Sequence, residues 1–286
     1  MKTLLAVINL PINSENFIEY TARMAEDLGM KLHLTYILNP SAYPLSTGIT
    51  GDATQPVDNS FLFEKDNAHK VIKKKIAHLK ENVPLRGSID FSTNTGSTDW
   101  VIKQFVDKNK AHMVVLDSYD KSGIWTLGSI NMDIALKVSC PAWIIPFEMP
   151  YQKFDKIIYA TNYNETDLKT IKDLIVITKN ISPQIIALHI AESSDFEEKA
   201  IEQGFTTKLI KEAKYDKLKV ETLIEKEGED LGEIINKYAS LKKANLIVVL
   251  KENRNFLERI FIPSSTKKII KESHLPVLVY QENKKK

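Results

Sequence analysis

The sequence has very little cysteine, no excess of charge of one sign and no long hydrophobic run. Its single cysteine, Cys140, cannot form an internal disulfide, which fits a reducing compartment. The 39 basic and 37 acidic residues leave a formal net charge of +2, so no strong field recruits nucleic acid or an anionic membrane. No apolar stretch approaches the roughly 18 residues that a transmembrane helix needs. We therefore expect a soluble, cytoplasmic protein that binds neither nucleic acid nor a membrane.

Apolar runs and helical patterns alternate along the first half of the chain. Strands are predicted at residues 3–9, 31–38, 87–93, 111–117 and 142–146, and helices at 14–28, 61–80, 98–108 and 129–138. The runs "MVVL" and "WIIP" are continuously apolar, as in strands that are covered on both faces of a parallel sheet. The alternation predicts βαβ units and a doubly wound sheet.

The second half repeats this order of elements. Its strands are predicted at residues 156–162, 183–190, 219–225, 244–250 and 277–280. A repeat of this length indicates duplication of a whole domain. We predict two tandem doubly wound α/β domains, at 1–148 and 152–282, each a five-stranded parallel sheet with helices on both faces. Pro146 and Pro150 bracket the linker between them.

The first half carries roughly 20 extra residues between its first and third strands. Most of them fall in residues 39–60, which are rich in proline, glycine, serine and threonine. Such a segment is either a functional lid or a long surface connection without regular structure.

The order of several short motifs resembles that of a known family. In the first half these are "LGS" and "SCPAWIIP", and in the second half "YATNYNETD" and "HLPVLVY". Over nearly its whole length the chain is similar to the universal stress proteins, as a tandem member. In nucleotide-binding members an aspartate ends the first strand, and a G-x2-G-x9-G-[ST] loop after the fourth strand wraps the phosphates. Glycines there let backbone N–H groups approach phosphate at a helix start.

This resemblance places the candidate nucleotide-binding residues in both halves. They are Asn9, Gly128, Ser129, Asn162, Asn253, Ser264 and Ser265. Asn9 and Asn162 stand at the aspartate positions, where an amide can still accept from an adenine amine. The serines either bind phosphate or only cap their helices, which is the usual role of serine at that place.

The loops depart from the family pattern in both halves. Asp117 and Asp120 replace the two leading glycines in the first half, and carboxylates there would repel phosphate. Leu250, Asn253 and Pro263 replace all three glycines in the second half, and Pro263 also lacks an N–H. We therefore expect no cofactor, while ATP stays open as a ligand.

No residue pattern indicates catalysis or metal binding. None of the six histidines has the spacing of a helical metal site, and no nucleophile–base pair stands out. The leading hypothesis is a non-enzymatic stress-response module that acts through binding, with a protein partner that the sequence does not identify. The alternative is an ATP-binding protein, with slow ATP hydrolysis left open. The family's mode of dimerisation implies an intramolecular pseudo-dimer through the two fifth strands, with a further homodimer open. The competing arrangement caps each strand edge with its own helix or loop.

Overall fold

The structure is a computed structural model of the whole chain, and it describes ten stretches of it. These are residues 1–8, 14–39, 59–83, 85, 87–108, 110–118, 130–146, 148–225, 231–251 and 275–281. The chain divides into two compact units, Met1–Val115 and Leu116–Lys286, and the division falls within a strand. Each unit is described by itself.

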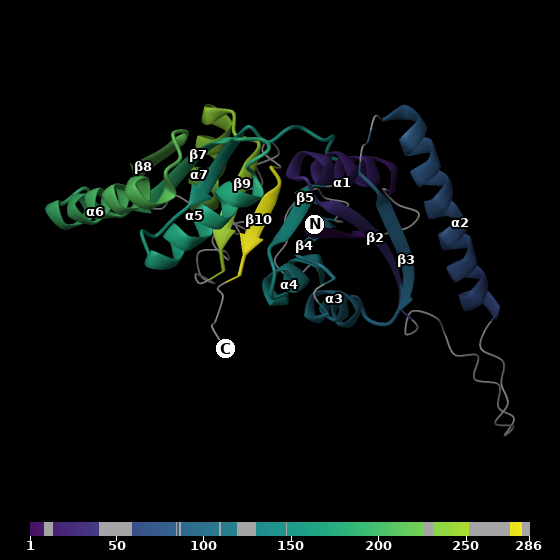
Figure 1. Cartoon of the computed structure of the whole chain (residues 1–286). Coiled ribbons are helices and arrows are strands. Elements are labelled where there is room, and N and C mark those ends of the chain that lie inside the picture. Colours follow the sequence, from purple (N-terminus) through teal and green to yellow (C-terminus); the bar gives the residue numbers. More distant parts are fainter. Residues whose placement is uncertain are drawn as a thin grey trace, which may run out of the picture. The chain divides into compact units, whose positions relative to one another are not determined.

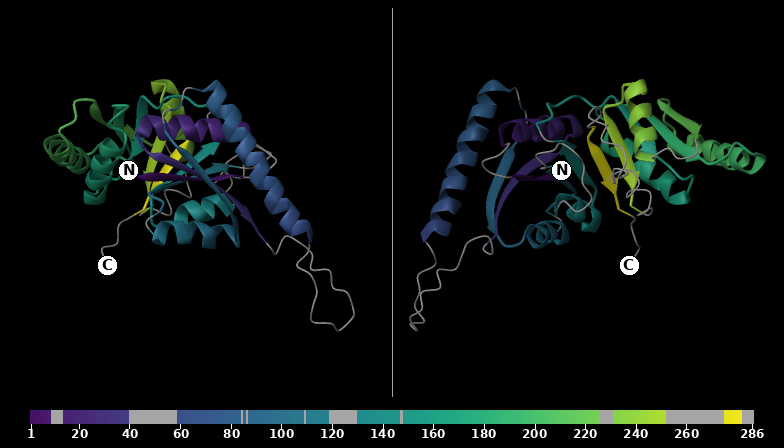
Figure 2. Two further views of the ribbon diagram at one scale, coloured as in Figure 1. Left: turned by 45° about the vertical axis from the view of Figure 1, so that its right-hand side comes forward. Right: turned by 180° about the vertical axis from the view of Figure 1, so that it is seen from behind.

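The first unit contains a parallel sheet with helices between successive strands (Figure 1). Its elements are β1 (Thr3–Ile8), α1 (Ser14–Leu28), β2 (Lys31–Leu38), α2 (Asn59–Asn82), β3 (Ile89–Thr95), α3 (Thr98–Asp107) and β4 (Met113–Ser118). The strand order is β3-β2-β1-β4, and all three pairings are parallel. In the views of Figures 1 and 2, α1 and α3 lie on opposite faces of these strands.

The second unit repeats this four-strand plan and adds two strands. Its elements are α4 (Ile130–Lys137), β5 (Ala142–Pro146), β6 (Lys156–Ala160), α5 (Glu165–Ile177), β7 (Gln184–Ala191), α6 (Phe196–Ala213), β8 (Leu218–Ile224), α7 (Leu231–Lys242), β9 (Leu246–Leu250) and β10 (Val277–Tyr280). The strand order is β5-β10-β9-β6-β7-β8, in which β5 and β10 are the two added strands. Every pairing is parallel except that of β5 with β10, which is antiparallel and sets Ile144 opposite Val277.

Burial explains why the apolar runs form central strands. Met113 to Leu116 in β4 are at most 1% exposed, and all five residues of β9 are buried. The outer strands β3 and β8 instead consist of half-buried and exposed residues, with no buried one. A strand that is covered on both faces gains from every side chain, because each buried CH₂ contributes about 0.8 kcal/mol.

The predicted fold class is confirmed. The chain is an α/β protein of two tandem doubly wound repeats with five strands each, β1–β5 and β6–β10. Observed strand boundaries differ from the expected ones by about two residues, as is usual where helix and strand ends fray. The domain limits 1–148 and 152–282 stay predictions. Of the long connection at 39–60, residues 40–58 lie outside the described residues.

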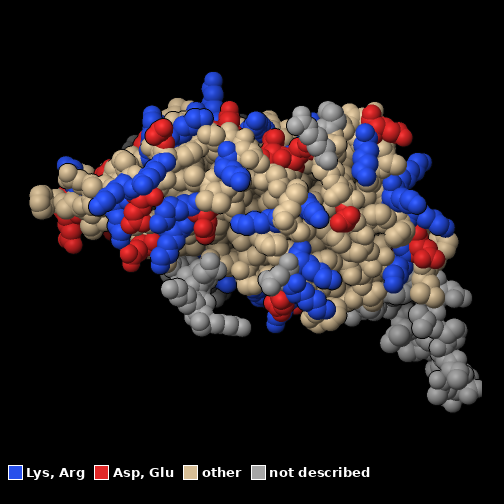
Figure 3. Space-filling view, in the orientation of Figure 1, with Lys and Arg blue, Asp and Glu red and all other residues tan. Residues whose placement is uncertain are grey.

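Charge is mixed over the visible surface. In the view of Figure 3, lysine and arginine side chains lie among aspartate and glutamate, including over α6. Among the helices that the structure describes, none has both the length and the apolar character that crossing a membrane requires.

Candidate functional site

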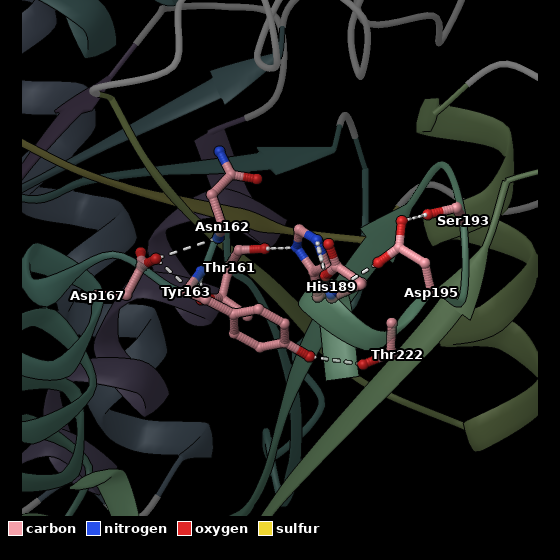
Figure 4. A network of polar contacts seen from close by, with 9 residues as sticks. Thr161, Asn162, Tyr163, Asp167, His189, Ser193, Asp195 and Thr222 are labelled. Carbon is pink, nitrogen blue, oxygen red and sulfur yellow. Dashed lines mark hydrogen bonds and ion pairs between the residues drawn. The ribbon is translucent and has the colours of Figure 1, made fainter. Parts of the chain in front are cut away.

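The candidate site that the structure describes best is the turn between β6 and α5 in the second unit (Figure 4). Strand β6 ends at Ala160, and α5 begins at Glu165 with Asn164 as its N-cap. The turn therefore consists of Thr161, Asn162 and Tyr163, at the carboxyl end of a central parallel strand. In open α/β sheets, ligands bind in the crevice outside the carboxyl ends of the strands.

Asp167 holds this turn together from inside α5. Its side chain is 3% exposed, and its two carboxylate oxygens accept four hydrogen bonds. The donors are the Tyr159 hydroxyl at 2.7 Å, the Thr161 hydroxyl at 2.8 Å, and the backbone N–H groups of Asn162 and Asn164, each at 3.1 Å. A buried carboxylate needs such compensation, and the donors in turn lose their freedom to move.

Asn162 is the predicted site residue on this turn. Its backbone N–H is engaged by Asp167, but its side chain is exposed. Figure 4 shows the Asn162 amide pointing away from the hydrogen-bonded cluster. This amide therefore stands on a rigid turn, with its donor and acceptor both facing outward.

His189 on β7 supports the turn from the neighbouring strand. Its Nδ1 lies 2.7 Å from the Thr161 carbonyl oxygen, and a carbonyl only accepts, so Nδ1 carries the proton. The other ring nitrogen, Nε2, lies 3.2 Å from Glu198 Oε1, and both side chains are largely buried.

The first turn of α6 fixes Glu198 in this position. Asp195 caps the helix by accepting from the Glu198 backbone N–H at 2.9 Å, and it also accepts from the Ser193 hydroxyl at 2.7 Å. These hydrogen bonds, that from Glu198 first, lower the pKa of Asp195.

Tyr163 closes the other side of the turn in a strained conformation. Its φ is +61°, in the left-handed region that costs a non-glycine residue about 1–2 kcal/mol. Its hydroxyl lies 2.6 Å from the Thr222 hydroxyl, and its ring centroid lies 4.4 Å from that of His189 and 4.9 Å from that of Phe205. These contacts offset the strain and fix the turn.

Burial gives a pH-dependent test of this packing. Burial raises the pKa of Tyr163 to about 12, and burial together with the Glu221 contact raises that of Tyr238 to about 12, above the ordinary 10.0. For both tyrosines the pKa is higher in the folded than in the unfolded state. The stability that comes from burying their neutral side chains is therefore complete below pH 10.0 and is lost as the pH rises through about 12. We expect Tyr163→Phe to remove one tyrosinate from the late part of an ultraviolet alkaline titration. An unchanged late titration in the variant would contradict this packing.

The hydroxyl of Thr161 is engaged on both sides within this network. The Thr161 hydroxyl, 2% exposed, donates to Asp167 and accepts from the Tyr163 N–H at 2.9 Å. In the stretches that the structure describes, no group of three or more His, Cys, Asp or Glu could hold a metal ion.

The structure describes the residue at the first glycine position of the loop motif in each half. These residues are Asp117, near the end of β4, and Leu250, at the end of β9. Asp117 lies inside β4 and is 2% exposed. Leu250 is the last residue of β9, is 7% exposed, and lies opposite Tyr280 in the ladder. The next backbone N–H, that of Lys251, donates to the Tyr280 carbonyl at 2.9 Å. At both positions the chain is still strand, with a side chain in place of a hydrogen.

The other predicted site residues lie outside the described residues. They are Asn9, Gly128, Ser129, Asn253, Ser264 and Ser265, together with Asp120 and Pro263. Asn162 is thus the one predicted position whose surroundings the structure describes.

Sequence reasoning missed Asp167, Thr161 and the His189–Glu198 contact. A signal for Asp167 was present, because Asn164 followed three residues later by an acid fits a capping box. The contacts of His189 carry no local signal, since its partners are 28 residues before it and nine after it.

Comparison with known proteins agrees with this geometry. The model of the universal stress protein family matches residues 1–146 and again 153–281. The chain belongs to the universal stress protein family. A universal stress protein of Methanocaldococcus jannaschii is 30% identical over 145 residues, which cover 46% of this chain and 85% of that protein.

Solved structures share the two-repeat fold. A universal stress protein from Archaeoglobus fulgidus has a TM-score of 0.68 at 12% identity, and the match covers 98% of both chains. A putative universal stress protein from Pseudomonas aeruginosa has a TM-score of 0.58 at 13% identity, covering 98% of this chain and 93% of that one. At these identities the likeness concerns the fold alone.

Proposed function

We propose that this universal stress protein is a non-enzymatic binding module of the stress response in which nucleotide affinity is weak or lost. The observation that carries the proposal is the identity of the two residues at which the loops after β4 and β9 would begin. A buried carboxylate, Asp117, is the second-last residue of one loop-bearing strand, β4, and a buried leucine, Leu250, is the last residue of the other, β9.

Asp117 opposes phosphate binding by its charge. The carboxylate is 2% exposed, so water screens it poorly and its repulsion of a phosphate anion is stronger than at a surface. The sequence adds Asp120 three residues later. A phosphate at this loop would meet negative charge where the family's pattern has glycine.

Leu250 opposes phosphate binding through the backbone. It pairs with Tyr280, and the following N–H already donates to the Tyr280 carbonyl. An N–H that completes a sheet ladder is not available to a phosphate oxygen. The residue also lacks the positive-φ freedom that glycine gives such loops.

A second candidate function is ATP binding, with slow hydrolysis, by the second repeat. The observation that favours it is Asn162, whose exposed amide stands on the turn that Asp167 fixes. An adenine amine could donate to this amide's oxygen. The turn is therefore suited to an adenine even though the loop after β9 is poorly suited to phosphates.

The proposal extends to assembly and location. We place the protein in the cytoplasm and propose that the two repeats form an intramolecular pseudo-dimer through their fifth strands. The antiparallel register of β5 and β10, with Trp143 opposite Leu278, supports it. A further homodimer and an unidentified protein partner belong to the same proposal.

Calorimetric titration with ATP and Mg²⁺ tests the nucleotide question. The loss of two backbone donors to charged oxygens, at about 1.5–3 kcal/mol each, should weaken binding by about two to four orders of magnitude. We expect no heat of binding at micromolar ATP. A micromolar Kd that disappears in Asn162→Ala would instead establish the ATP-binding alternative, and phosphate release would then show whether hydrolysis occurs.

A further inference from the structure

The first unit contains a pocket between the edge strand β3 and helix α3. It has a volume of about 210 Å³. Its lining includes two aromatic rings, two amides and two lysines: Trp100, Phe105, Asn94, Gln104, Lys108 and Lys110. We propose that this pocket binds a small planar aromatic molecule that carries a carboxylate or phosphate group.

Trp100 provides the surface for an aromatic ligand. The side chain is 55% exposed, although tryptophan is normally well covered. Its ring packs against Gly96, where an added Cβ would lie 3.1 Å from the ring atom Cε3, and Gly96 has a φ of +142°. The glycine therefore lets the indole approach the backbone, and this contact holds the ring in the pocket wall.

The two amides add directional polar groups. The Asn94 Nδ2 donates to the Thr35 hydroxyl at 2.9 Å and to the Ser92 hydroxyl at 2.8 Å, which fixes the amide's orientation. The Gln104 amide makes no hydrogen bond with any residue that the structure describes. Apolar walls with a few oriented polar groups are typical of small-molecule sites.

Lys108 and Lys110 give the pocket its charge preference. Both are exposed, and neither ammonium group pairs with a carboxylate in the described part of the chain. None of the described lining residues is acidic. His33 lies behind Phe105, with ring centroids 5.0 Å apart, and burial lowers its pKa against the opposing effect of Asp90. The two lysines, unpaired within the stretches that the structure describes, favour an anion as the ligand.

The pocket has no part in the nucleotide positions discussed above. It is built from β3, α3 and the segment before β4, whereas the family's motifs lie after β1 and β4. Its size lies below the roughly 300–1,000 Å³ of sites for drug-sized ligands, so the ligand is about one fused ring system.

Matched fragments test the proposal on the full-length chain. The probes are naphthalene-2-carboxylate, its neutral amide and naphthyl phosphate, titrated while the Trp100 indole N–H is followed by nitrogen-15 NMR. We expect the anions to shift this signal and to bind about tenfold more tightly than the amide. The tighter of the two anions then identifies the acidic group.

Variants separate the charge effect from general damage. The double variant Lys108→Gln/Lys110→Gln should weaken binding of the anions about tenfold and leave the amide unchanged. Lys103→Gln, an exposed lysine of α3 outside the lining, is the matched control and should change neither. No shift of Trp100 with any probe, equal affinity for anion and amide, or unchanged anion binding in the double variant would overturn the proposal.

Discussion

Asp167→Ala is expected to lower the free energy of unfolding by about 3–5 kcal/mol. The substitution removes the acceptor of four hydrogen bonds and leaves two buried hydroxyls, those of Tyr159 and Thr161, without it. A buried polar group without its partner costs about 1–3 kcal/mol. Tyr163 has a left-handed backbone conformation, and the residues on either side of it, Asn162 and Asn164, also lose the hydrogen bonds from their backbone N–H groups to Asp167. Urea-induced unfolding followed by circular dichroism measures the change.

Two further variants sharpen this test. Asp167→Asn keeps one oxygen acceptor and should fall between wild type and Asp167→Ala. Glu165→Gln changes a neighbouring acid of the same helix turn that is exposed and forms a surface ion pair with Lys208 at 2.8 Å, so no measurable change in stability is expected. A loss of less than about 1 kcal/mol in Asp167→Ala would show that the turn does not depend on this carboxylate.

The strands were predictable because burial on both faces leaves a plain pattern in the sequence. The "MVVL" and "WIIP" runs became β4 and β5, and all four of Met113 to Leu116 are at most 1% exposed. Because the strand–helix order repeats along the chain, the architecture of the second repeat was also predictable. Such patterns are formed by residues close together in the sequence, because side chains repeat with a fixed period along a strand or helix. They can therefore be recognised without the structure.

The site was predictable only in part because its contacts depend on rare backbone conformations. The resemblance placed Asn162 at the end of a strand, and the residue lies exposed in the turn, two residues after the end of β6. The cluster below it requires a positive φ at Tyr163, which tyrosine seldom adopts. The pocket beside β3 similarly depends on the φ of +142° at Gly96, which lets Trp100 approach the backbone.

Ile144→Asp is expected to cost more than about 4 kcal/mol, enough to unfold or aggregate the chain. Ile144 is 1% exposed and lies opposite Val277, which is 3% exposed, in the antiparallel pair of β5 with β10. A carboxylate there would be desolvated among apolar side chains, and no cation stands in either strand to pair with it. The loss also opens two apolar strand edges, which invite association between chains.

Size-exclusion chromatography with small-angle scattering, together with a thermal melt, measures this outcome, and Val279→Asp on the facing strand should behave in the same way. The matched control is Ile201→Asp on α6, where the side chain is 46% exposed and the new charge stays in water. If β5 and β10 form the contact of the proposed pseudo-dimer, both strand variants expand or aggregate while the control remains compact. A compact Ile144→Asp chain with an unchanged melting temperature would refute that contact, because a buried unpaired charge cannot be neutral to a tightly packed strand pair.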